Sequence, residues 1–120
     1  MKKILIVDDD KISREIFQEY LKDFSESLIM FEDGKCAYEK LSSENKISLV
    51  ITDIIMPEMD GWELIKKIRG LPKHKKTPII VVTSAEELDD ISKLFELGGL
   101  WFFNKPIEKT KLIELVGSIS

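Results

Sequence analysis

The sequence predicts a doubly wound α/β fold, in which a five-stranded parallel sheet carries helices on both faces. Three observations predict this class. Short apolar runs alternate five times with segments whose apolar residues recur at helical spacing. The runs are continuously apolar, as expected of strands that are buried on both faces. Polar and charged residues follow the runs directly, and open α/β sheets bind their ligands at these carboxyl ends.

Each element has its own local signal. The five apolar runs assigned to strands are 4–7, 28–31, 49–51, 79–82 and 100–103. The segments with helical spacing that follow them are 12–24, 35–41, 62–68, 88–95 and 111–116. The residues expected to cap helices or form turns between these elements are Asp10, Asp33-Gly34, Pro57, Asp60-Gly61 and Gly98-Gly99. Right-handed crossovers then favour the flavodoxin-like strand order 2-1-3-4-5.

Composition limits the possible functions. The chain has 120 residues, enough for one domain over 1–120, and a formal charge of −4. That charge argues against direct binding of nucleic acid and gives no attraction to anionic membranes. No apolar run is long enough to span a bilayer. The single cysteine, Cys36, fits a reducing compartment, so a cytoplasmic location is expected.

The strand ends gather acidic residues. Strand 4–7 runs into Asp8-Asp9-Asp10, and strand 49–51 leads to Asp53. These strands are neighbours in the expected order, about 4.8 Å apart, so their carboxylates should converge. Carboxylates this close repel one another unless a cation shares the site. Oxygen ligands without Cys or His favour Mg²⁺, with Mn²⁺ as a second choice.

Two more strand ends add groups that bind phosphate. Thr83 ends the fourth strand, and Lys105 follows the fifth. A carboxylate, a divalent cation, a hydroxyl and an ammonium around one point are typical of a phosphoryl-transfer site. The nucleophile would be an aspartate that forms an acyl phosphate. Asp53 is favoured over Asp8 and Asp9, because it stands alone on the central strand.

Four motifs in this order resemble the response-regulator receiver domains of two-component signalling, the CheY-like superfamily. They are 4–10, 53–61, 78–85 and Lys105-Pro106. The resemblance implies a phosphorelay signalling domain rather than an enzyme, although one that assists its own phosphorylation and dephosphorylation. It implies that Asp53 accepts a phosphoryl group from a histidine kinase, a histidine phosphotransfer protein or a small phosphodonor. It also implies Mg²⁺ ligands at Asp8, Asp9, Asp53 and the backbone carbonyl of Ile55, phosphoryl contacts from Thr83 and Lys105, and a cis Lys105-Pro106 bond.

The resemblance further implies a switch. Thr83 would move toward the phosphate and Phe102 would turn inward, altering the face formed by 88–95, 100–103 and 111–116 for a protein partner or a homodimer. Leu100 either tucks under the sheet edge or forms an apolar interface with Trp101. Ile55 and Ala85 cannot orient a water, so slow dephosphorylation is expected.

Other interpretations stay open at this point. A docking module that acts without being phosphorylated could carry the same motifs. A phosphatase of the haloacid dehalogenase type would use Asp8 as its nucleophile, and a flavin or nucleotide binder would need a phosphate loop after the first strand. His74 is interpreted as part of a solvated basic loop, because it lies in the charged run 73–76. The cognate kinase and the target are not predicted.

Overall fold

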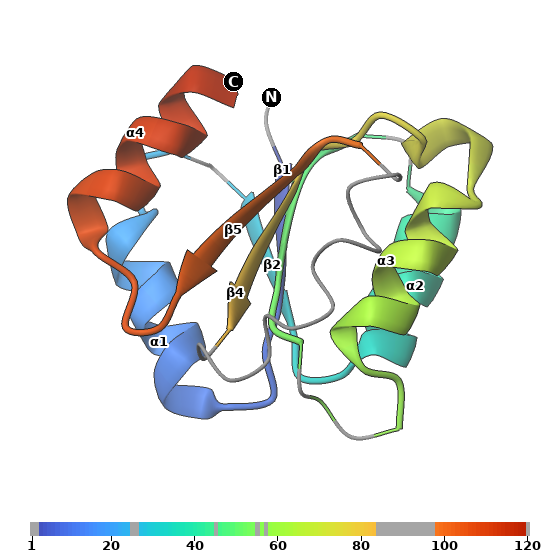
Figure 1. Ribbon diagram of the computed structural model, residues 1–120, viewed down its shortest axis with the longest axis horizontal. Coiled ribbons are helices and arrows are strands. Elements are labelled where there is room, and N and C mark those ends of the chain that lie inside the picture. Colours follow the sequence, from blue (N-terminus) through green and yellow to red (C-terminus); the bar gives the residue numbers. More distant parts are fainter. Residues whose placement is uncertain are drawn as a thin grey trace.

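A computed structural model describes residues 3–24, 27–44, 46–54, 56, 58–83 and 98–119, without the side chains of Ser27 and Thr83. Its five strands are all parallel and lie in the order β2-β1-β3-β4-β5. Their bounds are Lys3–Val7 for β1, Ser27–Phe31 for β2, Ile47–Thr52 for β3, Ile79–Thr83 for β4 and Leu100–Asn104 for β5. The predicted fold class and strand order are confirmed (Figure 1).

Helices cover both faces of the sheet. Their bounds are Lys11–Tyr20 for α1, Gly34–Ser43 for α2, Gly61–Arg69 for α3 and Lys109–Ile119 for α4, with a 3₁₀ turn, η1, at Pro72–His74. In Figure 1, α1 and α4 lie on one side of the sheet and α2 and α3 on the other. The helix predicted over 88–95 lies outside the described residues. None of the described helices is both long and apolar enough to cross a bilayer.

The sheet buries side chains on both faces, because successive residues of a strand point to opposite sides. On β1, Leu5 and Val7 join the core beneath α2 and α3, whereas Ile4 and Ile6 join the core beneath α1 and α4. All four side chains are buried. Continuous apolar runs are therefore what this architecture requires, which is why their pattern along the sequence indicated it.

Three helices begin at the edge of the sheet where the strands end. Asp10, Asp33 and Asp60 are their N-caps, and each side chain accepts a hydrogen bond from a backbone amide in the first helical turn. Gly61 allows α3 to start directly against the end of β3. A Cβ at this position would lie 2.2 Å from the carbonyl oxygen of Asp53, so only glycine fits here.

The interpretation of His74 as part of a solvated loop is wrong. Its side chain is fully buried. Nδ1 lies 2.9 Å from Oγ1 of Thr77, and Nε2 lies 2.9 Å from the carbonyl oxygens of both Leu41 and Glu44. Because carbonyls only accept hydrogen bonds, Nε2 carries a proton and donates it. The imidazole thus ties the end of α2 to the connection before β4, while the neighbouring lysines stay exposed.

Candidate functional site

The turn after β1 holds a buried carboxylate. The backbone amide of Asp8 donates to the carbonyl of Phe31, which continues the ladder between β1 and β2. The side chain of Asp8 is 1% exposed, and its Oδ1 accepts a hydrogen bond of 2.9 Å from the amide of Asp10. Asp9 and Asp10 are exposed, and Asp10 caps α1. The β1 end therefore offers one fixed carboxylate and one exposed carboxylate, Asp9, at the same edge.

A second carboxylate follows β3. The amide of Asp53 donates to the carbonyl of Val7, so its backbone is held against the end of β1. Its Oδ1 accepts a hydrogen bond of 2.6 Å from the amide of Ile54. The side chain of Asp53 is 11% exposed. Asp53 is thus fixed in orientation but more accessible to solvent than Asp8.

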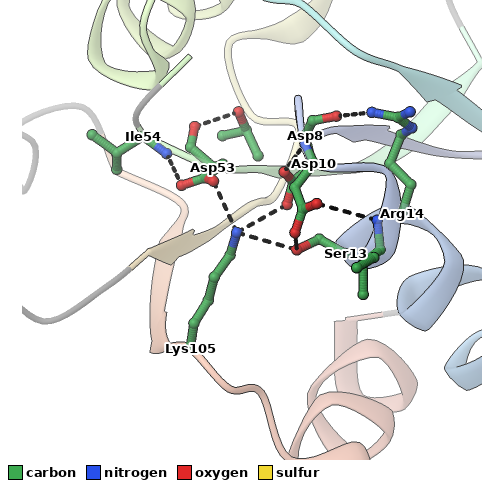
Figure 2. Close-up of polar contacts among 9 residues, drawn as sticks. Asp8, Asp10, Ser13, Arg14, Asp53, Ile54 and Lys105 are labelled. Atoms are coloured by element: carbon green, nitrogen blue, oxygen red, sulfur yellow. Dashed lines mark hydrogen bonds and ion pairs between the residues drawn. The ribbon is translucent and has the colours of Figure 1, made fainter.

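Lys105 joins the two carboxylates. It follows β5, and its Nζ lies 2.9 Å from Oδ2 of Asp53 and 3.1 Å from Oδ2 of Asp8. Figure 2 shows the lysine side chain reaching between the two aspartates. The Lys105-Pro106 bond is cis, as predicted. The convergence of Asp8, Asp53 and Lys105 at one edge of the sheet, which the strand order predicts, is confirmed.

The pKa values of Asp8 and Lys105 are both raised, for different reasons. Burial raises the pKa of Asp8 above its ordinary value, and the amide of Asp10 and the charge of Lys105 offset only part of this effect. Burial alone would lower the pKa of Lys105. The hydrogen bond to Asp53 and the negative charges of Asp8 and Asp53 outweigh it, so the pKa of Lys105 is raised. Lys105 therefore stays charged, and Asp8 is a carboxylate whose ionised form gains from any added cation.

The carboxylates also fit a metal ion. One oxygen from each of Asp8, Asp9 and Asp53 can be chosen so that all three lie within 4.8 Å of one another. Hard oxygen donors at this spacing suit Mg²⁺, which leaves part of its octahedron to water. Burial is the main cause of the raised pKa of Asp8 and the charge of Asp53 adds to it, so a cation at this point would favour the ionised carboxylates.

Sequence reasoning missed two residues in the first turns of α1. The hydroxyl of Ser13 donates to Oδ2 of Asp10 and lies 3.4 Å from Nζ of Lys105. The guanidinium of Arg14 donates to the backbone carbonyl of Asp8 at 2.6 Å (Figure 2). The side chains of a helix lean toward its N-terminus, so residues three and four positions after the N-cap Asp10 reach back over the aspartate turn. That offset is the signal from which both could have been found.

The remaining predicted residues have different outcomes. Thr83 ends β4 and pairs with Asn104, but its side chain lies outside the described part of the chain, as does Ile55. Phe102 is half-buried and packs against the core beneath α2 and α3. Leu100 packs against the same core, which agrees with the expectation that it tucks under the sheet edge. Trp101 points the other way on this edge strand and is 37% exposed.

Comparison with known proteins identifies the family of the chain. The family model described as the response regulator receiver domain matches residues 4–117. The chain is similar to the two-component response regulator ORR11 of rice, with 34% identity over 97% of this chain and 79% of that protein. It also shares 30% identity with the 3′,5′-cyclic-nucleotide phosphodiesterase regA of Dictyostelium discoideum, over 98% of this chain but only 15% of that larger protein.

Solved structures give the same result. The chemotaxis protein CheY4 of Vibrio cholerae superimposes with a TM-score of 0.88 at 26% identity, covering 100% of this chain and 99% of that one. A response regulator receiver protein from Pseudomonas putida superimposes with a TM-score of 0.87 at 31% identity, covering 98% and 96% of the two chains. The chain belongs to the response regulator receiver domain family. It is therefore a phosphoacceptor signalling domain of the two-component type, not an enzyme in the usual sense.

Proposed function

We propose that residues 1–120 form a single receiver domain in which Asp53 accepts a phosphoryl group and thereby changes a surface that a partner protein recognises. The observation that carries this proposal is the convergence of Lys105 on the carboxylates of Asp53 and Asp8, from the ends of three different strands. A phosphoryl group needs this combination of an oxygen nucleophile and fixed positive charge.

Accessibility favours Asp53 over Asp8 as the nucleophile. The side chain of Asp53 is 11% exposed, whereas that of Asp8 is 1% exposed. The oxygens of both aspartates accept hydrogen bonds, so exposure is what separates the two side chains. A donor phosphate can approach Asp53 with less rearrangement. This argues against a phosphatase of the haloacid dehalogenase type, in which Asp8 would attack.

The transfer step follows from these contacts. A carboxylate oxygen of Asp53 bonds to phosphorus while the nitrogen–phosphorus bond of a phosphohistidine breaks, and the bonding electron pair stays on the imidazole nitrogen, which takes up a proton. The ammonium of Lys105, now 2.9 Å from Asp53, offsets the negative charge of the phosphoryl oxygens. Thr83, at the end of the neighbouring β4, supplies a hydroxyl to the same group. The domain in this way assists its own phosphorylation and dephosphorylation.

Mg²⁺ completes the site in this proposal. Asp8, Asp9, Asp53 and the backbone carbonyl of Ile55 hold it, and Mn²⁺ can replace it. When bound, the ion neutralises charge on the phosphoryl oxygens. Asp8 and Asp53 share Lys105 between them, so ion binding and the lysine contacts compete for the same oxygens. Lys105 lies where it would also contact a phosphoryl group on Asp53.

An exposed apolar surface on α1 is the proposed docking site for the phosphodonor protein. Ile12 is 65% exposed and Ile16 is 40% exposed, although both are large apolar side chains. They border a cavity of about 350 Å³ that continues to Ser13 and Lys105 beside the site. A histidine kinase or histidine phosphotransfer protein that docks here brings its phosphohistidine within reach of Asp53. Exposed apolar patches of this kind commonly mark such interfaces.

The output surface is proposed at the edge of the sheet that β5 forms. Thr83 and Phe102 form the switch, and the face formed by 88–95, β5 and α4 contacts a downstream protein or a second copy of the chain. Trp101, on the edge strand β5, is the exposed aromatic residue available to anchor this contact. We propose a cytoplasmic protein whose Asp53 site and output face act through protein contacts, without direct binding of nucleic acid or membrane at either. Ile55 and Ala85 make its dephosphorylation slow.

The test is phosphorylation of the purified chain by acetyl phosphate, followed by intact mass. Wild type is expected to gain one phosphoryl group with Mg²⁺ or Mn²⁺ and none in excess EDTA, while Asp53→Asn gains none under any condition. Equal labelling of the variant would contradict the role of Asp53. Unlabelled wild type that still binds its partner would instead support a phosphorylation-independent docking module.

A further inference from the structure

Positive charge is concentrated in the last part of α3 and in its connection to β4. Residues 66–76 hold six of the 18 Lys and Arg residues and none of the 22 Asp and Glu residues. The whole chain has a formal charge of −4, so this segment is opposite in sign to the rest. In Figure 1 the connection lies beyond the amino ends of the strands, whereas Asp53 follows the carboxyl end of β3. The segment thus takes no part in the carboxylate site.

Three lysines of this segment border one groove. The groove has a volume of about 460 Å³, with Lys73, Lys75 and Lys76 around it and apolar surface from Ile47, Pro72 and Pro78. Within the described part of the chain, none of the three ammonium groups has a carboxylate within 4.0 Å. Lys73 donates to the backbone carbonyl of Ser42 at the end of α2. The like charges of this loop are therefore not neutralised by ion pairs with described residues.

A half-buried arginine and a buried histidine fix the loop that carries these lysines. The guanidinium of Arg69 donates to the carbonyls of His74 at 2.9 Å and Thr77 at 2.7 Å, and continues to the carbonyl of Gly98 at 3.0 Å. The imidazole of His74 anchors the same loop to the end of α2. The backbone beneath the lysines is therefore in place before any ligand arrives. A preformed site loses less conformational entropy on binding than a flexible one.

We propose that this groove is a second ligand site, which binds a phosphate-bearing anion independently of Asp53. Ammonium groups bind phosphate as point charges, and an anion relieves the repulsion among the three lysines. The volume lies within the range of small-molecule sites, and the apolar floor accommodates an organic portion next to the phosphate. The phosphate belongs either to a soluble phosphorylated molecule or to a lipid headgroup, and the two sources are separable by experiment.

The experiment is a titration of the ¹⁵N-labelled chain with pyrophosphate in EDTA. Without a divalent cation the carboxylates of Asp8, Asp9 and Asp53 repel the probe, so shifts must arise elsewhere. Saturable amide shifts are expected in 73–77 and 47–48, with affinity that falls as salt rises. The double variant Lys75→Gln/Lys76→Gln should bind about fivefold more weakly, the combined effect of two exposed ion pairs.

A matched control separates a site from general attraction. Lys22→Gln/Lys111→Gln removes the same charge from exposed lysines elsewhere and should bind as wild type does. Equal weakening in both double variants, or no groove shifts up to about 10 mM pyrophosphate, overturns the proposal. The lipid source is assigned if wild type binds phosphatidylglycerol vesicles but not phosphatidylcholine vesicles, and if the Lys75→Gln/Lys76→Gln variant loses this binding. The soluble source is assigned if wild type binds pyrophosphate but not the phosphatidylglycerol vesicles. Asp53→Asn should bind pyrophosphate normally, so the proposal stands apart from phosphorylation.

Discussion

Replacing His74 with alanine is expected to lower the free energy of unfolding by about 3–5 kcal/mol. The side chain is fully buried and lies 2.9 Å from each of three oxygen atoms, on Thr77, Leu41 and Glu44. The substitution leaves two carbonyls without their donor, which costs about 1 kcal/mol or more each. It also removes a buried ring, and large-to-small changes in the interior add a cavity.

The assay is urea unfolding followed by circular dichroism, with thermal unfolding as a second measurement. The expected loss corresponds to a melting temperature lower by roughly 12–20 °C for a domain of this size. Thr77→Val removes one of the three contacts and should lose about 1 kcal/mol. Lys75→Ala, an exposed neighbour, should change stability by less than about 0.5 kcal/mol. If His74→Ala matches Lys75→Ala, the imidazole is solvated and the structural argument for a rigid 72–78 loop fails.

Four further predictions concern the site and its surface. Asp8→Asn should stabilise the Mg²⁺-free chain at neutral pH. The pKa of Asp8 is raised in the folded state, so the folded state holds the proton of this carboxyl more tightly than the unfolded state does. The stability of wild type therefore falls as pH rises from 3.8 through that raised pKa, and the variant avoids this loss. Urea unfolding across pH measures this, and a variant less stable than wild type at neutral pH contradicts it. Arg14→Met should weaken Mg²⁺ binding about tenfold, because it leaves the Asp8 carbonyl without its donor, and Arg14→Lys should bind as weakly although it keeps the charge. Tryptophan fluorescence measures the binding. Stronger Mg²⁺ binding by Arg14→Met than by wild type would mean that the charge of Arg14 matters more than its positioning of Asp8. Lys105→Met should strengthen Mg²⁺ binding, because a competing ammonium is gone, yet slow phosphorylation by acetyl phosphate by about 10²-fold. If Mg²⁺ affinity and phosphorylation rate instead change equally and in the same direction, this division of roles is refuted. Trp101→Ala should weaken partner binding or self-association by about tenfold or more while leaving phosphorylation unchanged, as measured by ultracentrifugation and mass spectrometry, and unchanged association removes the proposed anchor.

The architecture was predictable from sequence because its signals are local. Each apolar run is long enough for a buried strand and too short for a helix, and the cap residues Asp10 and Asp60 mark where helices begin. Once the strands are parallel and ordered 2-1-3-4-5, the carboxyl ends of β1, β3 and β5 face the same edge. The meeting of Asp8, Asp53 and Lys105 then follows from topology.

Other features that sequence reasoning missed, unlike Ser13 and Arg14, depend on contacts between distant segments. His74 binds carbonyls 33 and 30 residues earlier in the chain, at Leu41 and Glu44. Its neighbours in sequence are lysines and prolines, whose composition is typical of a solvated connection. Arg69 likewise bonds backbone carbonyls rather than a carboxylate, and the carbonyl of Gly98 lies 29 residues away. No pattern of side-chain types records which backbone carbonyls a fold leaves unpaired.

The central claim is that Asp53 itself carries the phosphoryl group. The most direct test is to phosphorylate the chain with acetyl phosphate and Mg²⁺, reduce the acyl phosphate with borohydride, and locate the modified residue by peptide mass spectrometry. Borohydride converts an aspartyl phosphate to homoserine, so homoserine at position 53 is the predicted result. Homoserine at position 8 would contradict the assignment, and so would a phosphorylated chain in which position 53 remains aspartate.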